Sequence, residues 1–285
     1  MAAALGLLLG AGGASASTTV GSQLALAPVV ASCGGTSTFM NTALAAGTLQ
    51  APFDGAVLRW RLALAAPGGG SFTYKLRVLR PAGGGMYTGA GTGPAQTAPS
   101  TGVNVLTLAS PLPVKAGDLI GIDCPAGAPS PFSNLAPASS SIGTFGPPLA
   151  DGEPRSPGGP FANDEMLINA DVAPKPSNTF RFGGVARNKH KGTAILSVIV
   201  PGPGALVLGG KGIRAQEAAG GAMARKAVTS AGTVKLQIKP KGKSKRKLSE
   251  NDKATINASV TYTPSGEIAG DPNRQSRKIK LVKKP

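Results

Sequence analysis

The chain has 285 residues, of which 41% are hydrophobic, so it is long and apolar enough for one large or two ordinary domains. Its 41 glycines and 25 prolines follow no collagen period and favour many short strands joined by turns, which predicts an all-β fold. The net charge is +17, while one histidine, His190, and two cysteines are too few and too scattered for the usual zinc sites or for Ser–His–Asp and Cys–His catalysis.

The N-terminal segment has the pattern of a secretory signal peptide. An apolar run ending near Ala11 is followed by Ala-Ser-Ala at 14–16, the small-x-small pattern that signal peptidase cuts. No Lys or Arg precedes Arg59, so the basic start of a typical signal is missing. The run is too short to span a bilayer, and no later segment reaches that length. We therefore expect a signal peptide over residues 1–16 and a secreted, extracellular protein without a transmembrane segment.

Two alternating runs dominate the next part of the chain. AVLRWRLAL places Trp60 on one face and Arg59 and Arg61 on the other, which predicts a half-buried strand. FTYKLRVLR repeats the pattern, with Tyr74 inward and Arg77 outward. Because a Gly-rich turn separates the two runs, we expect them to form a β-hairpin.

Shorter apolar runs follow at NVLTL, DLIGIDC, SIGTF and EMLINADV, so eight to ten strands are expected over residues 17–173. That number predicts a jelly-roll-like β-sandwich. Cys33 and Cys124 both lie in this region. An even pair of cysteines in an exported chain predicts a disulfide rather than a metal site or a nucleophile.

Charge divides the chain near Lys175. Residues 1–175 carry 8 basic and 8 acidic side chains, whereas residues 176–285 carry 22 basic and 5 acidic ones, so the net charge of +17 lies wholly in the second part. The Pro-rich stretch 174–178, PKPSN, suits a short stiff linker at this boundary.

Residues 179–285 read as a second, basic β-sandwich. GTVKLQIK and ATINASVTY alternate apolar with polar residues, and TAILSVIV, GALVLGG and RKIKLVK bring the expected total to about seven strands. That size and spacing are typical of an immunoglobulin-like sandwich. RAQEAAGGAMARK and KGKSKRKLSENDK read mainly as solvated loops.

Several phrases resemble exported actinobacterial β-sandwich proteins of unassigned function: APFDGAVLRWRL, PLPVKAGDLIGIDCP, INADV, NKHKGTAILSVIVPGPGALVLGGKGI and GTVKLQIKPKGKSKRKL. The resemblance covers nearly the whole chain after residue 16. It implies a Cys-containing N-terminal sandwich followed by a Lys-rich immunoglobulin-like module, and an exported protein. It implies no catalytic or binding residue.

Other chemistries remain open as alternatives. Exposed aromatic side chains can bind sugars, and Tyr87, Phe132, Phe145 and Phe161 are the loop aromatics that such a site would use, with Tyr87 singled out as a ligand contact. The carboxylates of the N-terminal part include Asp54 and Asp118, for which we expect turn-stabilising roles. Spacing selects no pair of them for glycan cleavage, and the Asp and Glu residues between 151 and 165 lack the repeated spacing of a Ca²⁺ loop.

The leading interpretation is a secreted, non-catalytic protein associated with the cell envelope, needing no cofactor or metal. Its basic module would contact anionic wall or extracellular polymers, because Lys outnumbers Arg 15 to 7 there and lysine suits diffuse charge matching. Dedicated nucleic-acid binding is disfavoured by the scarcity of aromatics for stacking. The alternatives are a carbohydrate-binding jelly-roll and a carboxylate-dependent glycan-cleaving enzyme. The expected polyanion contacts are Lys235, Lys239, Lys241, Lys243, Lys245, Arg246 and Lys247.

Overall fold

A computed structural model describes residues 17–66, 72–213 and 225–284. The chain divides after Lys175 into two compact units, called here the first unit (described from residue 17 to 175) and the second unit (176–284). The predicted signal peptide, residues 1–16, lies outside the described residues.

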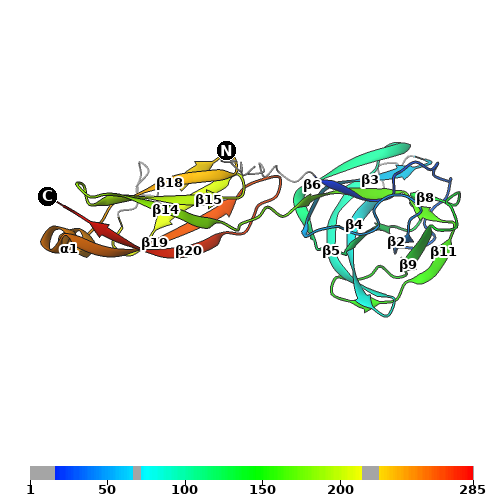
Figure 1. Cartoon of the computed structure of the whole chain (residues 1–285). Coiled ribbons are helices and arrows are strands. Elements are labelled where there is room, and N and C mark those ends of the chain that lie inside the picture. The colour runs from blue at the N-terminus through cyan, green and yellow to red at the C-terminus, as the bar shows by residue number, and fades with distance from the viewer. Residues whose placement is uncertain (1–16, 67–71, 214–224, 285) are drawn as a thin grey trace, which may run out of the picture. The chain divides into compact units, whose positions relative to one another are not determined.

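The first unit is built from antiparallel strands in three sheets (Figure 1). The four-stranded sheet has the order β1-β13-β3-β6, the seven-stranded sheet β10-β5-β4-β7-β2-β9-β11, and β12 pairs with β8. The strands are β1 Thr18–Gly21, β2 Ser37–Ala43, β3 Gly55–Leu64, β4 Thr73–Gly83, β5 Met86–Thr97, β6 Gly102–Val114, β7 Leu119–Cys124, β8 Phe132–Ser133, β9 Ser141–Phe145, β10 Pro154–Arg155, β11 Gly158–Ala162, β12 Glu165–Met166 and β13 Ile168–Pro174.

The apolar faces of the two larger sheets enclose one core. Trp60 and Leu62 of β3 and Ile168 of β13 pack in the same cluster as Tyr74 of β4 and Ile122 of β7. Trp60 is fully buried, and its indole Nε1 donates to Oε1 of Gln96 over 2.8 Å, which satisfies its one polar atom. The predicted inward positions of Trp60 and Tyr74 are confirmed.

The expected hairpin between AVLRWRLAL and FTYKLRVLR is wrong. β3 pairs with β6 and β13, whereas β4 pairs with β5 and β7 in the other sheet. Each run has a single apolar face, which must be buried. Two such strands can bury these faces either by pairing edge to edge in one sheet or by packing face to face across the core from two sheets. The alternation pattern therefore predicts the strands but not their partners.

A second, smaller cluster covers the opposite face of the seven-stranded sheet. It contains Met40, Leu79, Leu119 and Phe145 from the sheet, together with Leu149 from the segment after β9. Because this face is covered, the sheet is buried on both sides around β4. Arg77, which we predicted to point to solvent, is consequently only 4% exposed, and Phe145 is a core residue instead of a loop aromatic.

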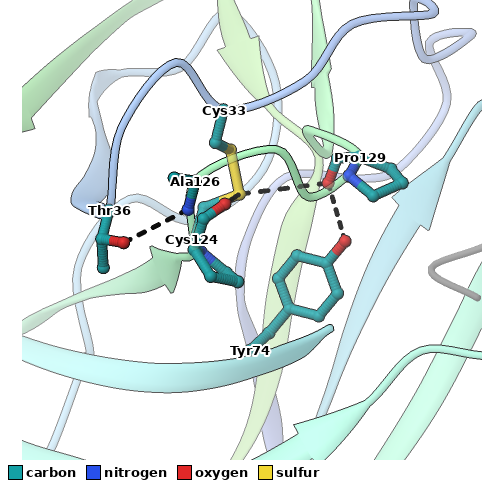
Figure 2. Close-up of a disulfide and its surroundings, with 7 residues drawn as sticks. Cys33, Thr36, Tyr74, Cys124, Ala126 and Pro129 are labelled. Carbon is teal, nitrogen blue, oxygen red and sulfur yellow. Dashed lines mark hydrogen bonds between the residues drawn. A yellow bond between two sulfur atoms is a disulfide. The ribbon is translucent and has the colours of Figure 1, made fainter. Parts of the chain in front are cut away.

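The predicted disulfide is confirmed. Cys33 and Cys124 are bonded, with Cα atoms 6.2 Å apart, and both residues are buried. Figure 2 shows the bond beside Tyr74, whose phenolic oxygen donates to the carbonyl of Pro129 over 2.8 Å. Burial raises the pKa of Tyr74 to about 12. The bond fastens the irregular segment before β2 to the end of β7.

The described residues of the second unit form seven strands and one helix (Figure 1). The sheets have the orders β14-β15-β18 and β17-β16-β19-β20 and share a core that includes Leu196, Leu236 and Tyr262. The elements are β14 Arg181–Asn188, β15 Thr193–Val200, β16 Gly204–Gly209, β17 Arg225–Val228, β18 Gly232–Ile238, α1 Lys243–Asn251, β19 Lys253–Pro264 and β20 Asn273–Val282. His190 is exposed in the turn between β14 and β15, as expected.

The segment KGKSKRKLSENDK was expected to be mainly a loop, and this is wrong, because most of it forms α1. Leu248 is the one buried residue of the helix and belongs to the core cluster of the second unit. A single apolar anchor in a strongly basic segment gives no periodic pattern, which is why the helix was missed.

Candidate functional site

The seven predicted polyanion contacts all lie at the surface of the second unit. Lys235 is on β18, Lys239 and Lys241 follow that strand, and the other four belong to the first turns of α1. All seven residues are exposed. None of them forms an ion pair with a described residue. Their charges are therefore open to solvent and to an external anion.

The charges of α1 are arranged against its dipole. Lys243, Lys245, Arg246 and Lys247 lie in the N-terminal half, and the first turn holds no acidic residue. The N-cap residue is Gly242, which provides no side-chain cap. Cations near the positive end of a helix are unfavourable, and an anion there is favourable. The helix is thus held by Leu248 rather than by its own end charges.

A second group of cations, which the sequence analysis missed, lies on β20. Arg274, Lys278 and Lys280 are exposed and point away from the core, with Ser276 at the outward position between Arg274 and Lys278. Successive outward positions on a strand are about 7 Å apart. The register places them beside Thr261, Asn257 and Thr255 of β19. The result is a row of cations flanked by hydroxyl and amide groups, called here the β20 row. The alternation of polar and apolar residues in RQSRKIKLVK is the sequence pattern from which these outward cations could have been predicted.

The remaining polar residues of β20 close the edge of the sandwich. Side chains of Asn273, Gln275 and Arg277 donate to the carbonyls of Asn178, Phe180 and Gly183, with distances of 3.1 Å from Asn273 and 2.8 Å from Gln275. In return, Arg187 of β14 donates to the carbonyl of Lys280 over 2.8 Å. These bonds satisfy main-chain carbonyls next to the strand edge. On the outer face, Arg274 donates from its Nε to the hydroxyl of Ser259 over 2.7 Å, while Lys278 and Lys280 form no ion pair with a described residue.

In the first unit the arginines are paired instead. On the outer face of the four-stranded sheet, Asp171 receives two hydrogen bonds from Arg61, of 2.9 and 2.8 Å, and others from Arg59 and from Thr19. The Arg61 hydrogen bonds hold the pKa of Asp171 well below its usual range, with Arg59 and Thr19 assisting and burial opposing. The same contact raises the pKa of Arg61.

Arg77 forms a second network, inside the covered face of the seven-stranded sheet. Its guanidinium bridges Asp123 at 3.1 Å and Asp151 at 2.9 Å and donates to the carbonyl of Leu149. Arg80 makes a two-point contact with Asp118 at 2.8 Å. These side chains tie the loop around residue 150 to β4 and β7. No motif marked them, because their partners are distant in sequence.

An open cavity of 710 Å³ lies on the outer face of the four-stranded sheet. Polar side chains form most of its lining, including Thr19, Ser22, Gln23 and Asn169, together with Arg61. This was not anticipated from the sequence.

The loop aromatics are not gathered at one place. Tyr87 is partly buried and packs against the small cluster that contains Phe145. Phe132 is partly buried against the main core, and Phe161 is 47% exposed on β11. The structure thus brings no pair of these side chains into a common exposed platform among the residues it describes.

Most carboxylates of the first unit have structural partners. Asp54 accepts from the amide of Ala116 and Asp118 from the amide of Lys115, so the predicted turn roles are confirmed. Glu165 is buried and accepts from the hydroxyls of Ser22 and Ser140. Across the described ranges, no three His, Cys, Asp or Glu side chains come together in a way that could hold a metal ion.

No family model and no curated protein matches the chain. The resemblance to exported actinobacterial proteins therefore stays a prediction. In the part of the chain that the structure describes, no helix has the length and apolarity needed to cross a membrane.

Proposed function

We propose that the protein is a secreted, non-catalytic attachment protein whose second unit binds anionic polymers of the cell envelope. The observation that carries the proposal is that the seven predicted cations between Lys235 and Lys247 are exposed and form no ion pair with a described residue. Each lysine near an anionic surface contributes about 1 kcal/mol before salt screening.

Two surfaces of the second unit suit such a polymer. The β20 row offers three cations on one outer sheet face, next to Thr255, Asn257 and Thr261. The N-terminal half of α1 offers four cations at the positive end of the helix dipole, so the side chains and the dipole both favour an anion there. A flexible polyanion needs no bidentate geometry, so lysine serves at both surfaces.

We further propose that the first unit is a jelly-roll and the second an immunoglobulin-like sandwich. In the first unit, eight strands follow the orders β1-β13-β3-β6 and β5-β4-β7-β2, with the chain passing repeatedly between sheets, as two interlocked Greek keys would require. In the second, β14 to β20 lettered A to G give sheets A-B-E and D-C-F-G. The constant-type immunoglobulin order differs only in the sheet that holds strand D.

Salt-dependent binding of the full chain tests the function. We expect the protein to bind dextran sulfate and isolated envelope material at low salt and not to bind neutral dextran. About 0.5 M NaCl should release it, because exposed charge pairs are strongly screened at that concentration. The variants K245Q/K247Q on α1 and K278Q/K280Q on β20 each remove about 2 kcal/mol and should weaken low-salt binding by about 30-fold.

The matched control is K75Q/K115Q, because both lysines are exposed on the first unit and the charge change is the same. An equal loss in this control, or binding that survives half-molar salt, would contradict the proposal. Export has a separate check: the N-terminus of the protein in the extracellular fraction should be Ser17, and a chain there that begins at Met1 would count against the signal peptide.

A further inference from the structure

We propose that the cavity on the four-stranded sheet is a binding site for a carboxylated sugar of the uronic-acid class. The site lies within the first unit, and its occupation does not depend on the polyanion contact proposed for the second unit. Three features of the cavity favour such a ligand: the row of residues that forms its floor, a surplus positive charge beside it, and the backbone of its rim.

The floor is a cross-strand row. An isolated bridge joins Thr48 to Gly21, and the register continues from Gly21 to Asn169 of β13 and from Asn169 to Arg61 of β3. Asn169 is itself fixed, because its Nδ2 donates to the carbonyl of Ser22 over 2.8 Å and its Oδ1 accepts from Arg61 over 3.1 Å. The polar groups of the floor are therefore held in place before any ligand arrives.

One end of this floor carries more positive than negative charge. Arg59 and Arg61 both bond to the single carboxylate of Asp171, so two guanidinium groups share one negative charge. Arg59 lies next to the lining residue Arg61 on the outer face of β3 and is not itself a lining residue. Its side chain is 53% exposed and uses its Nε for this bond, so its two terminal amino groups make no hydrogen bond with a described residue. A guanidinium fork of this kind matches a carboxylate. The buried Glu165 lies behind Ser22 and does not line the cavity.

The other lining residues suit the rest of a sugar ring. Thr48 and Gln23 present hydroxyl and amide groups that can both donate and accept, as sugar hydroxyls require. The hydroxyl of Thr19 donates to Asp171 over 3.0 Å and can still accept. Val103, which is 50% exposed, and Leu24 supply apolar surface for the C–H face of a ring. A volume of 710 Å³ is within the usual range for small-ligand sites.

The rim has a strained backbone that the interior holds in place. Leu24 lines the cavity with φ of 56°, a left-handed conformation that is uncommon for a leucine. Its amide donates to the hydroxyl of Ser22 over 2.8 Å, and that hydroxyl donates to buried Glu165 over 2.6 Å. Strained residues persist where the surroundings fix them, and they concentrate at ligand sites.

Titration of the full chain with trigalacturonate, followed in amide-resolved NMR spectra at about 0.5 M NaCl, tests the site. That salt concentration suppresses diffuse binding to the second unit. We expect shifts at Gln23, Thr48 and Val103 and a much weaker response to the methyl ester of the same trimer. Arg59→Gln should reduce the affinity by about tenfold, the usual loss for a charge-assisted hydrogen bond.

Lys75→Gln is the matched control, since it removes one positive charge from an exposed strand position of the same unit and should leave the affinity unchanged. Gln23→Ala, at an exposed rim position, should weaken binding a few-fold without touching the Arg59–Asp171 contact. Equal binding of trimer and ester, unchanged affinity in Arg59→Gln, or shifts confined to α1 and β20 would each overturn the proposal. The last outcome would still leave polyanion binding by the second unit standing.

Discussion

The first and second units carry positive charge in opposite ways. Each of the five arginines of the first unit, Arg59, Arg61, Arg77, Arg80 and Arg155, is paired with a carboxylate. In the second unit, none of the seven predicted contacts between Lys235 and Lys247 has such a partner among the described residues. Arginine therefore serves the structure of one unit, and lysine is left available on the other. The net charge of a unit does not distinguish cations that stabilise the fold from cations that are available to a ligand, whereas the presence or absence of ion pairs does.

The largest expected effect concerns the disulfide, which makes the first unit depend on a covalent link that the second lacks. Replacing Cys33 and Cys124 by alanine releases a loop with a sequence separation of 91 residues, and the chain-entropy model predicts a loss of about 4 to 5 kcal/mol in the free energy of unfolding. Trp60 is the chain's one tryptophan and is buried in the first unit, so its fluorescence during denaturation measures this loss. A matching destabilisation of the second unit would break the comparison.

A smaller effect is expected where the paired arginines lose their acceptor. Asp171→Asn leaves Arg59 and Arg61 side by side, and because the arginines are partly exposed we expect a loss of about 1 to 3 kcal/mol. The folded pKa of Asp171 lies below the unfolded value of about 3.9, so its contribution is complete at neutral pH and declines as the pH falls below about 4.

Unfolding curves from pH 7 to pH 2 should therefore show the wild type and Asp171→Asn converging in acid. Arg59→Gln is the control, because Arg61 still holds Asp171 in that variant. A constant difference between wild type and Asp171→Asn across the whole pH range would contradict the assigned role.

The smallest effect has the opposite sign. Lys243→Glu at the start of α1 reverses an unfavourable interaction with the helix dipole, so it should stabilise the second unit by about 0.3 to 1 kcal/mol while weakening polyanion binding. Thermal unfolding of the second unit, measured beside the dextran sulfate affinity, checks both parts. Lys235→Glu, on β18, removes the same charge away from the helix and should weaken binding without the gain in stability.

The sequence predicted individual strands well and their arrangement poorly. Alternation correctly placed Trp60 inside, and the pair of cysteines predicted the disulfide. Pairing of β3 and β4 was wrong because one apolar face per strand fits more than one neighbour. Arg77 and Phe145 were misplaced because the covering of a sheet by a distant loop leaves no trace in the local pattern.

The candidate sites show the same division. The exposure of Lys235 to Lys247 follows from a run of charged residues and was predictable. The β20 row was visible as alternation but was interpreted only as a strand. The cavity needed the register of β1, β13 and β3 to be known, since Gly21, Asn169 and Arg61 meet only across three strands that lie far apart in the chain.

The side-chain hydrogen bonds between the β14 and β20 edges bear on whether neighbouring copies of the protein can pair through these strands when they are crowded on one polymer. A polymer that concentrates a basic β-protein brings strand edges of neighbouring copies together, and open edges would then join into aggregates. Here, Asn273, Gln275 and Arg277 already engage carbonyls beside the facing strand. At these two edges, therefore, neighbouring copies crowded on one polymer should not pair strand to strand.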